Sequence, residues 1–249
     1  MNSLRLPSSH SEPAGLGTHP TNYRWQTVLQ PGLIETAERK VEEQKQLLRG
    51  EVQIEVGDTL CRYFLLHYLQ AFHTLYPEIH FPVTNRTSRE TVKLLHEGQM
   101  DFCIVHLPVE TQQIHIEPVM ELHDCFVVGQ SRKQLVEQPL GLPELAQQSL
   151  ILLESGNVTR QHIERYFAAG GIVMTPEIEL GSLDLLAEFA NIGLGVACVV
   201  REFVQKEFDS EELYEIPVET PVLPRQVGLI WSQNVPLSHA AKHFVDRIL

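Results

Sequence analysis

The sequence predicts an α/β protein made of two successive units, each with a sheet covered by helices. From residue 51 onward, short apolar runs alternate with segments of helical period, and glycines or hydroxyl residues mark most segment ends. Strands separated by helices favour parallel sheets with right-handed crossovers. The apolar fraction of 43% in 249 residues also suffices for a sizeable core.

The charge balance and the cysteines limit the classes of partner and compartment. The formal net charge is -13, from 32 acidic and 19 basic residues, which gives little non-specific affinity for nucleic acid or an anionic membrane. The N-terminal stretch MNSLRLPSSHSEPAGLG has no apolar region of a secretory signal, and no apolar run reaches membrane-spanning length. The cysteines form no C-x-x-C pair, as suits reduced thiols. We expect a cytoplasmic protein that binds no membrane.

The first fifty residues divide into a polar tail and a charged helix. Residues 1–32 are rich in Ser, Pro, Gly and Thr, and we expect a disordered or degenerate tail. Residues 33–50, LIETAERKVEEQKQLLRG, are expected to form a helix with a narrow apolar stripe, ended by Gly50. Such a stripe is typical of packing against another helix, although a helix lying on the domain surface fits it too.

Strand and helix segments then follow in order. In the first unit, VQIEV, IHFPVTN, DFCIVHL and HDCFVV are expected strands, with Pro82 on a sheet edge where its missing N–H is harmless. In the second unit, SLILLE, PEIEL and GVACVV are expected strands around the helices VTRQHIERYFAAGG and SLDLLAEFANIG. The late strands ELYEIPV and RQVGLIW precede a closing amphipathic helix, PLSHAAKHFVDRIL.

Motifs of enzymes and metal sites are weak in this chain. GLG in NIGLGVACVV lacks the third glycine of a dinucleotide motif and precedes a strand. His67, His73 and His80 are spread over a helix and the following turn, so exposed helix histidines explain them better than a metal site. Asp124 beside Cys125 has no evident oriented base. We therefore expect no catalytic residue, no metal and no cofactor.

Small polar residues follow several expected strands and begin the next helix. The carboxyl ends of parallel strands form the binding crevice of an open sheet, and helix N-termini there favour anions and polar molecules. Taken singly, each turn reads as an ordinary N-cap. His106 and His162 lie near such turns, where they either line a pocket or pack beside the core. The turns are Asp58-Thr59, Thr87-Ser88, Asn157-Val158-Thr159 and Gly181-Ser182.

Three longer segments resemble a known family. GEVQIEVGDTLCRYFLLHYLQAFHTLYPEIH carries a strand, a capped helix and F-x-x-x-Y-P before the next strand. TNRTSRETVKLLHEGQMDFCIVHLP carries G-x-x-D before an apolar strand, and ELGSLDLLAEFANIGLGVACVV runs a Ser-capped helix into G-L-G-V-A. In order and spacing they resemble the effector-binding domain of LysR-type bacterial transcription regulators, and residues 33–50 resemble the linker helix through which such regulators dimerise. The resemblance covers about residues 33–249.

The resemblance implies two Rossmann-like subdomains in a type 2 periplasmic-binding-protein-like fold, preceded by a linker helix. Subdomain 1 is expected at 51–129 plus 217–249, and subdomain 2 at 130–216. A small anionic or polar effector is expected between them, with homodimers or homo-oligomers as the assembled form. The expected ligand-binding residues are Thr59, Thr87, Ser88, Pro108, Asn157, Thr159 and Ser182.

The chain departs from the family at two places. Only 32 residues precede the linker helix, too few for a winged helix-turn-helix, so we expect DNA binding only where a full-length form or a partner supplies that module. Gly57 stands where many members have a hydroxyl residue. Two alternatives remain open: a solute-binding protein, disfavoured by the missing signal and the linker-like helix, and an enzyme of the same fold. The enzyme would need a convergent acid or base, whereas the turns offer Thr, Ser and Asn, so we expect no enzyme.

Overall fold

The computed structural model describes residues 49–85, 93–109 and 111–249. The expected tail at 1–32, almost all of the expected helix at 33–50, and both Thr87 and Ser88 lie outside these residues. None of the helices in the described ranges is long and apolar enough to span a membrane.

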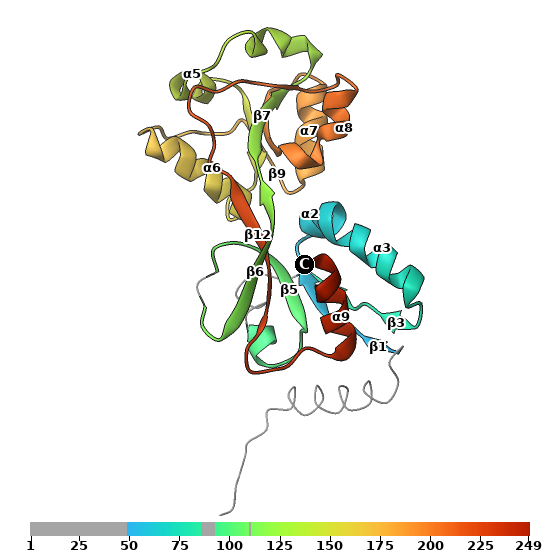
Figure 1. The fold of residues 1–249 in the computed structure, drawn as a ribbon. Coiled ribbons are helices and arrows are strands. Elements are labelled where there is room, and N and C mark those ends of the chain that lie inside the picture. The colour runs from blue at the N-terminus through green and yellow to red at the C-terminus, as the bar shows by residue number, and fades with distance from the viewer. Residues whose placement is uncertain (1–48, 86–92, 110) are drawn as a thin grey trace, which may run out of the picture.

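The first half of the molecule is a five-stranded mixed sheet with the order β4-β2-β5-β12-β6 (Figure 1). Strands β4, β2 and β5 are parallel, whereas β12 runs antiparallel to both β5 and β6. Pro82 lies next to the edge strand β4, and its carbonyl accepts a hydrogen bond from Ile54, as its position on a sheet edge predicts. The strands are β2 (Ile54–Val56), β4 (Val83–Thr84), β5 (Phe102–His106), β6 (Ile114–Leu122) and β12 (Arg225–Ser232).

Helices on one side of this sheet come from both ends of the described chain. Phe72 of the first helical segment packs edge-on against Phe244 of the last helix, so these two helices cover the same core. A short parallel pair, β1 with β3, lies beside them. The elements are β1 (Gly50–Glu51), α2 (Asp58–Leu60), a π-helical turn (Cys61–Leu65), α3 (Leu66–Leu75), β3 (Ile79–His80) and α9 (His239–Ile248).

The second half is another five-stranded mixed sheet, with the order β11-β7-β10-β8-β9. Its strands are β7 (Asp124–Val128), β8 (Leu150–Leu153), β9 (Ile178–Leu180), β10 (Val196–Val200) and β11 (Tyr214–Glu215). Its helices are the 3-10 helix Gln130–Val136, α5 (Leu142–Ala146), α6 (Val158–Ala169), α7 (Leu183–Asn191), the 3-10 helix Arg201–Phe203 and α8 (Gln205–Asp209).

Three features differ from the sequence-based expectation. Both sheets contain antiparallel pairs, so neither is purely parallel. The nine-residue strand β6 was not anticipated, because Pro118 interrupts its apolar run; β6 is an edge strand, where a proline is tolerated. Strand β7, from the segment HDCFVV expected in the first unit, pairs with β10 in the second sheet, so the chain passes from one sheet to the other near His123.

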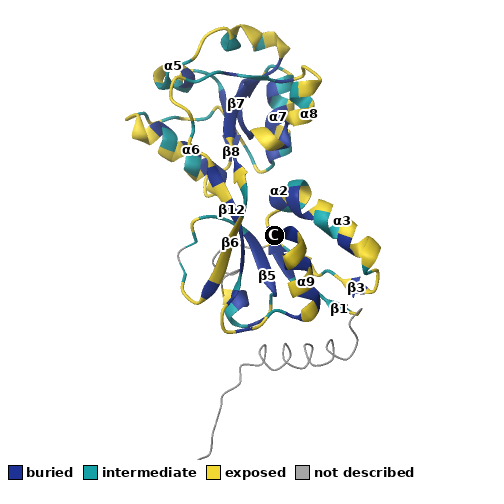
Figure 2. Cartoon of the chain, viewed as in Figure 1, coloured by how far each residue is buried: buried dark blue, intermediate teal, exposed yellow. Residues whose placement is uncertain are grey.

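The buried strands form the centre of each half, and the main core runs through both. Figure 2 shows the central strands largely buried, and the edge strand β6 and the outer helix faces largely exposed. One apolar cluster contains Phe102 and Leu229 of the first sheet together with Val199 and Leu186 of the second half. Leu60 and Leu183 belong to this cluster as well. Apolar contact therefore joins the halves on the side of α2 and α7, in addition to the two chain crossings.

Candidate functional site

A cavity of about 480 Å³ lies between the two sheets. Its walls come from the segments that follow the carboxyl ends of β2, β5, β8, β9 and β10, which is where the strand-helix pattern predicts a crevice. The first half contributes Glu55, Asp58, Thr59, Asn85 and His106, and the second half contributes Asn157, Thr159, Gly181 and Phe203. Arg225, at the start of the returning strand β12, also lines the cavity.

The expected ligand-binding residues fall into three groups. Thr59, Asn157 and Thr159 line the cavity together, although they come from opposite halves. Ser182 lies between the lining residues Gly181 and Leu183 but is not itself part of the wall, and Pro108 is exposed away from it. Thr87 and Ser88 lie outside the described residues.

The helix starts around the cavity are built differently from one another. Asn157 caps α6, because its Oδ1 accepts a hydrogen bond of 2.8 Å from the backbone N–H of Thr159. Ser182 occupies the N-cap position of α7, but its side chain makes no capping bond, contrary to the capping role we expected. Gly57 stands at the N-cap of α2 and has no side chain to cap it. The first turn of α2, which lines the cavity, therefore has no side-chain cap from Gly57.

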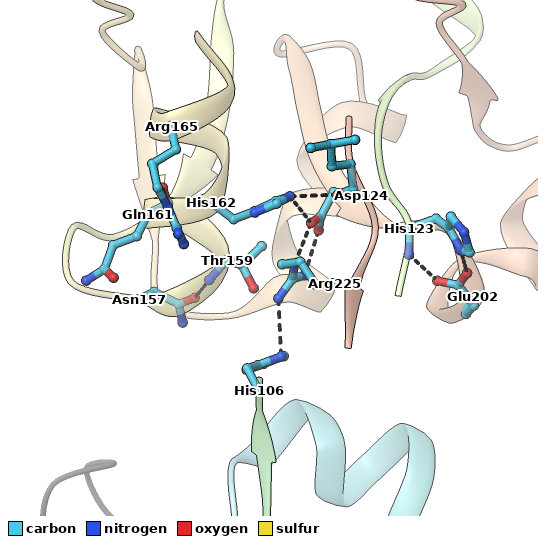
Figure 3. A network of polar contacts seen from close by, with 11 residues as sticks. His106, His123, Asp124, Asn157, Thr159, Gln161, His162, Arg165, Glu202 and Arg225 are labelled. Carbon is cyan, nitrogen blue, oxygen red and sulfur yellow. Dashed lines mark hydrogen bonds and ion pairs between the residues drawn. The ribbon is translucent and has the colours of Figure 1, made fainter. Parts of the chain in front are cut away.

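A buried ion pair between Asp124 and Arg225 lies at the cavity, with Arg225 in its wall (Figure 3). The Asp124 carboxylate accepts from Arg225 Nε at 2.6 Å and from Arg225 Nη2 at 2.7 Å, a bidentate pair. The side chains of Asp124 and Arg225 are 0% and 5% exposed. Asp124 begins β7 and Arg225 begins β12, so the pair ties together the two strands at which the chain crosses between the halves.

Two histidines flank this ion pair. Arg225 Nη1 lies 3.3 Å from His106 Nδ1, and His162 Nε2 lies 2.8 Å from the carbonyl oxygen of Leu223 and 3.9 Å from Asp124 Oδ2. Burial, then the charges of Arg225 and His162, lower the pKa of His106 to about 4. His106 is therefore a neutral ring at physiological pH.

The structure does not support a catalytic pair of Asp124 and Cys125, which was the pair considered from the sequence. Asp124 faces Arg225 rather than Cys125. Burial raises the pKa of the Cys125 thiol well above its usual range, so the thiol stays protonated and is no nucleophile. Within the described part of the chain, no three histidine, cysteine or carboxylate side chains gather closely enough to hold a metal ion.

A second contact joins the halves beside the cavity, between the π-helical turn and α7. Tyr63 donates a hydrogen bond to Asp184 Oδ1, and Arg62 Nη1 lies 2.7 Å from Asp184 Oδ2. The Tyr63 ring stacks on Phe203 with centroids 4.4 Å apart. Burial and the bond to Asp184 raise the pKa of Tyr63 to about 12, so this phenol keeps its proton. Polar and aromatic contacts thus join the two halves on the side of α2 and α7.

Sequence reasoning missed Arg225 and weighed Asp124 only as part of a catalytic pair with Cys125. The signal that pointed to both was a charge at the start of an apolar run: Arg225 is the first residue of RQVGLIW and Asp124 the second of HDCFVV. A charge is buried so deeply only when it is paired. Nothing in the sequence, however, relates two positions that are 101 residues apart.

Comparison with known proteins finds transcription regulators among the relatives. The HTH-type transcriptional regulator YeiE of Escherichia coli K12 is 24% identical over 222 residues, which are 88% of this chain and 75% of YeiE. The RuBisCO operon transcriptional regulator of Allochromatium vinosum is 25% identical over 214 residues, covering 85% of this chain and 70% of the relative.

Solved structures share the fold. The CcmR regulatory domain of Synechocystis PCC6803, in complex with 2-PG, superposes with a TM-score of 0.70 at 18% identity, covering 80% of this chain and 96% of that domain. An H2O2-bound OxyR mutant of Corynebacterium glutamicum gives a TM-score of 0.68 at 20% identity, covering 86% of this chain and 69% of OxyR. The expected type 2 periplasmic-binding-protein-like α/β fold is confirmed.

A family model assigns this chain to a family, which the low sequence identities to these single proteins do not do by themselves. The model described as LysR substrate binding domain matches residues 45–249, most of the chain and all of both sheets. The chain is thus a member of the LysR substrate-binding-domain family, the effector-binding part of LysR-type transcription regulators.

Proposed function

We propose that this chain senses a small polar effector, with an anionic group or acceptor oxygens, in the cavity between the two sheets. The observation that carries the proposal is that both halves supply polar side chains to one cavity at the carboxyl ends of their strands. A molecule bound there contacts both halves, so binding shifts the equilibrium between closed and open arrangements. Such a shift is the means by which the effector would control transcription.

The lining groups constrain the effector's chemistry. Thr59, Asn157 and Thr159 are the proposed direct contacts, and Arg225 and His106 add N–H donors to the same cavity. Glu55 and Asp58 bring two carboxylates into the same wall, so the effector also carries hydrogen-bond donors. The complexes of CcmR with 2-PG and of OxyR with H2O2 support a small polar ligand. Thr87, Ser88, Ser182 and Pro108 remain proposed contacts, and none of them is among the described residues that line the cavity.

We propose that the functional subdomains are residues 50–122 with 225–249, and residues 124–218. The sheet memberships of β6, β7 and β12 support this division, as does the bridge between Leu140 and Val218 in the second half. The crossing strands then act as the hinge between the subdomains. This division puts the Asp124–Arg225 pair at that hinge.

The proposed assembly is a homodimer or homo-oligomer, without enzymatic activity, in the cytoplasm. DNA engagement belongs to a helix-turn-helix supplied by a full-length form or a partner. The two relatives named above, both transcription regulators, support these proposals. Sedimentation velocity over a wide concentration range tests the assembly, and a monomer at every concentration would count against it.

A thermal-shift screen of metabolites followed by a matched pair of variants tests the effector site. Thr59→Val keeps the shape of a lining side chain but removes its hydroxyl, and Thr74→Val makes the same change on α3, where the hydroxyl bonds the carbonyl of Gln70. We expect Thr59→Val to weaken the hit's affinity by roughly tenfold and Thr74→Val to leave it unchanged. A hit that binds both variants equally well would remove Thr59 from the site. Turnover of the hit would favour the enzyme alternative.

A further inference from the structure

Arg225 determines which nitrogen of the neighbouring His106 ring carries the proton. An arginine side chain has five N–H donors and no acceptor. The contact of 3.3 Å between Arg225 Nη1 and His106 Nδ1 therefore requires Nδ1 to accept with its lone pair. In the neutral ring the proton must then lie on Nε2.

The guanidinium that sets this tautomer is itself held in place. Asp124 binds Nε and Nη2 of Arg225 at 2.6 Å and 2.7 Å, which leaves Nη1 to face His106 (Figure 3). Both side chains of this ion pair are buried, so rotation of the guanidinium would expose an unpaired charge to a poorly solvated interior. The orientation of His106 is thus determined by groups from β7 and β12.

The other ring nitrogen of His106 has a different environment. His106 ends β5 and lines the cavity. Among the described residues, the hydrogen-bond contact of the His106 side chain is that of Nδ1 with Arg225, which leaves Nε2 for a bound molecule. A donor at the wall of a ligand cavity gains a partner when the ligand presents an acceptor, and it disfavours a ligand that places an apolar group there.

We propose that His106 is a specificity-determining residue of the effector site, whose Nε2–H donates a hydrogen bond to an acceptor oxygen of the bound molecule. The oxygen belongs to a carboxylate, a phosphate or a carbonyl group. This inference rests on the proposed function, since it assumes that an effector occupies the cavity.

The charge state of the ring supports this role. The groups that face His106 are Arg225 on β12, His162 on α6 and, one contact further, Asp124 on β7; Glu55 and Asp58 lie in the same cavity wall. Burial and the nearby positive charges lower the pKa of His106 to about 4. The ring therefore offers one donor at fixed position throughout the physiological pH range, in contrast to an exposed histidine.

The first arm of the test needs no ligand. Two-bond ¹H–¹⁵N correlation spectra of the ¹⁵N-histidine-labelled full chain distinguish the tautomers, and His106→Gln assigns the signals by their loss. We expect the pattern of a neutral Nε2–H ring at pH 7 that persists when the pH is lowered to about 5.5. A Nδ1–H tautomer, or a titration midpoint near 6.5, would overturn the proposal.

The second arm uses defined probes: inorganic phosphate, citrate, succinate and 2-PG, followed by calorimetry and by the His106 signals. His106→Gln places an amide N–H near the position of Nε2, whereas His106→Asn reaches only the position of Nδ1. For a probe that binds the wild-type chain, we expect Gln to keep affinity within about threefold and Asn to lose roughly tenfold or more. His115→Gln is the control, because His115 stacks on Trp231 outside the cavity wall.

The outcomes separate this inference from the proposed function. A probe that binds all variants with equal affinity and leaves the His106 signals unmoved overturns the role of His106 alone. If neither these probes nor the metabolite screen stabilises the wild-type chain, the effector site itself fails, and the role of His106 fails with it.

Discussion

Breaking the Asp124–Arg225 pair should destabilise the protein far more than breaking a surface ion pair. Asp124→Asn keeps the shape of the side chain but leaves the Arg225 charge without a counter-charge. Because the two side chains are 0% and 5% exposed, water cannot replace the lost carboxylate. Removing one partner of a buried pair costs about 3–5 kcal/mol.

The matched control lies on the exposed face of α9. Lys242 Nζ and Asp246 Oδ2 are 3.5 Å apart, with side chains 68% and 56% exposed. Exposed pairs of this i,i+4 kind contribute about 0.3–0.5 kcal/mol. Asp246→Asn therefore makes the same chemical change as Asp124→Asn, with an expected effect on the free energy of unfolding about ten times smaller.

Urea unfolding followed by far-UV circular dichroism measures the difference. For a domain of this size, 3–5 kcal/mol corresponds to a fall in melting temperature of roughly 6–20 °C. The double variant Asp124→Leu with Arg225→Met should recover part of the loss, because it removes both charges from the interior. If Asp124→Asn and Asp246→Asn differ by less than about 0.5 kcal/mol, the inference that the pair is buried and unsolvated is wrong.

Three further predictions concern single side chains near the cavity. In the folded protein the pKa of His106 is lowered from 6.5 to about 4, so between those pH values only the unfolded chain binds this proton. The free energy of unfolding should therefore fall as the pH drops through that window, by roughly 3 kcal/mol at pH 4. Urea titrations of the wild type and His106→Gln at several pH values isolate the contribution of His106, as the difference between the two proteins. Asn157→Ala removes the cap of α6 and should lower the free energy of unfolding by about 1 kcal/mol, whereas Asn157→Asp keeps the acceptor for Thr159; equal losses in the two variants would contradict the capping role. Tyr63→Phe keeps the stack on Phe203 but removes the bond to Asp184, with an expected loss of about 1 kcal/mol in thermal unfolding; an unchanged melting temperature would show that this bond does not help to hold the halves together.

Local pattern predicted most of the elements. Runs such as LILL and VACVV are buried strands β8 and β10, and VTRQHIERYFAA is helix α6, capped by Asn157 as expected. The place of the cavity also followed, because polar turns at strand ends mark the crevice of an α/β sheet. Of the expected contacts, Thr59, Asn157 and Thr159 meet there, whereas Pro108 and Ser182 do not line it.

The sequence by itself determined the α/β class, the order of the elements and the region of the site, because hydrophobic period and helix caps act over a few residues. Only the tertiary structure decided which sheet β7 joins, since an apolar strand such as DCFVV fits the centre of either sheet. It alone also decided that Arg225 contacts both Asp124 and His106. A charged residue at the start of a buried strand needs an oppositely charged partner. Which residue is that partner depends on how two strands that lie far apart in the sequence meet in the fold.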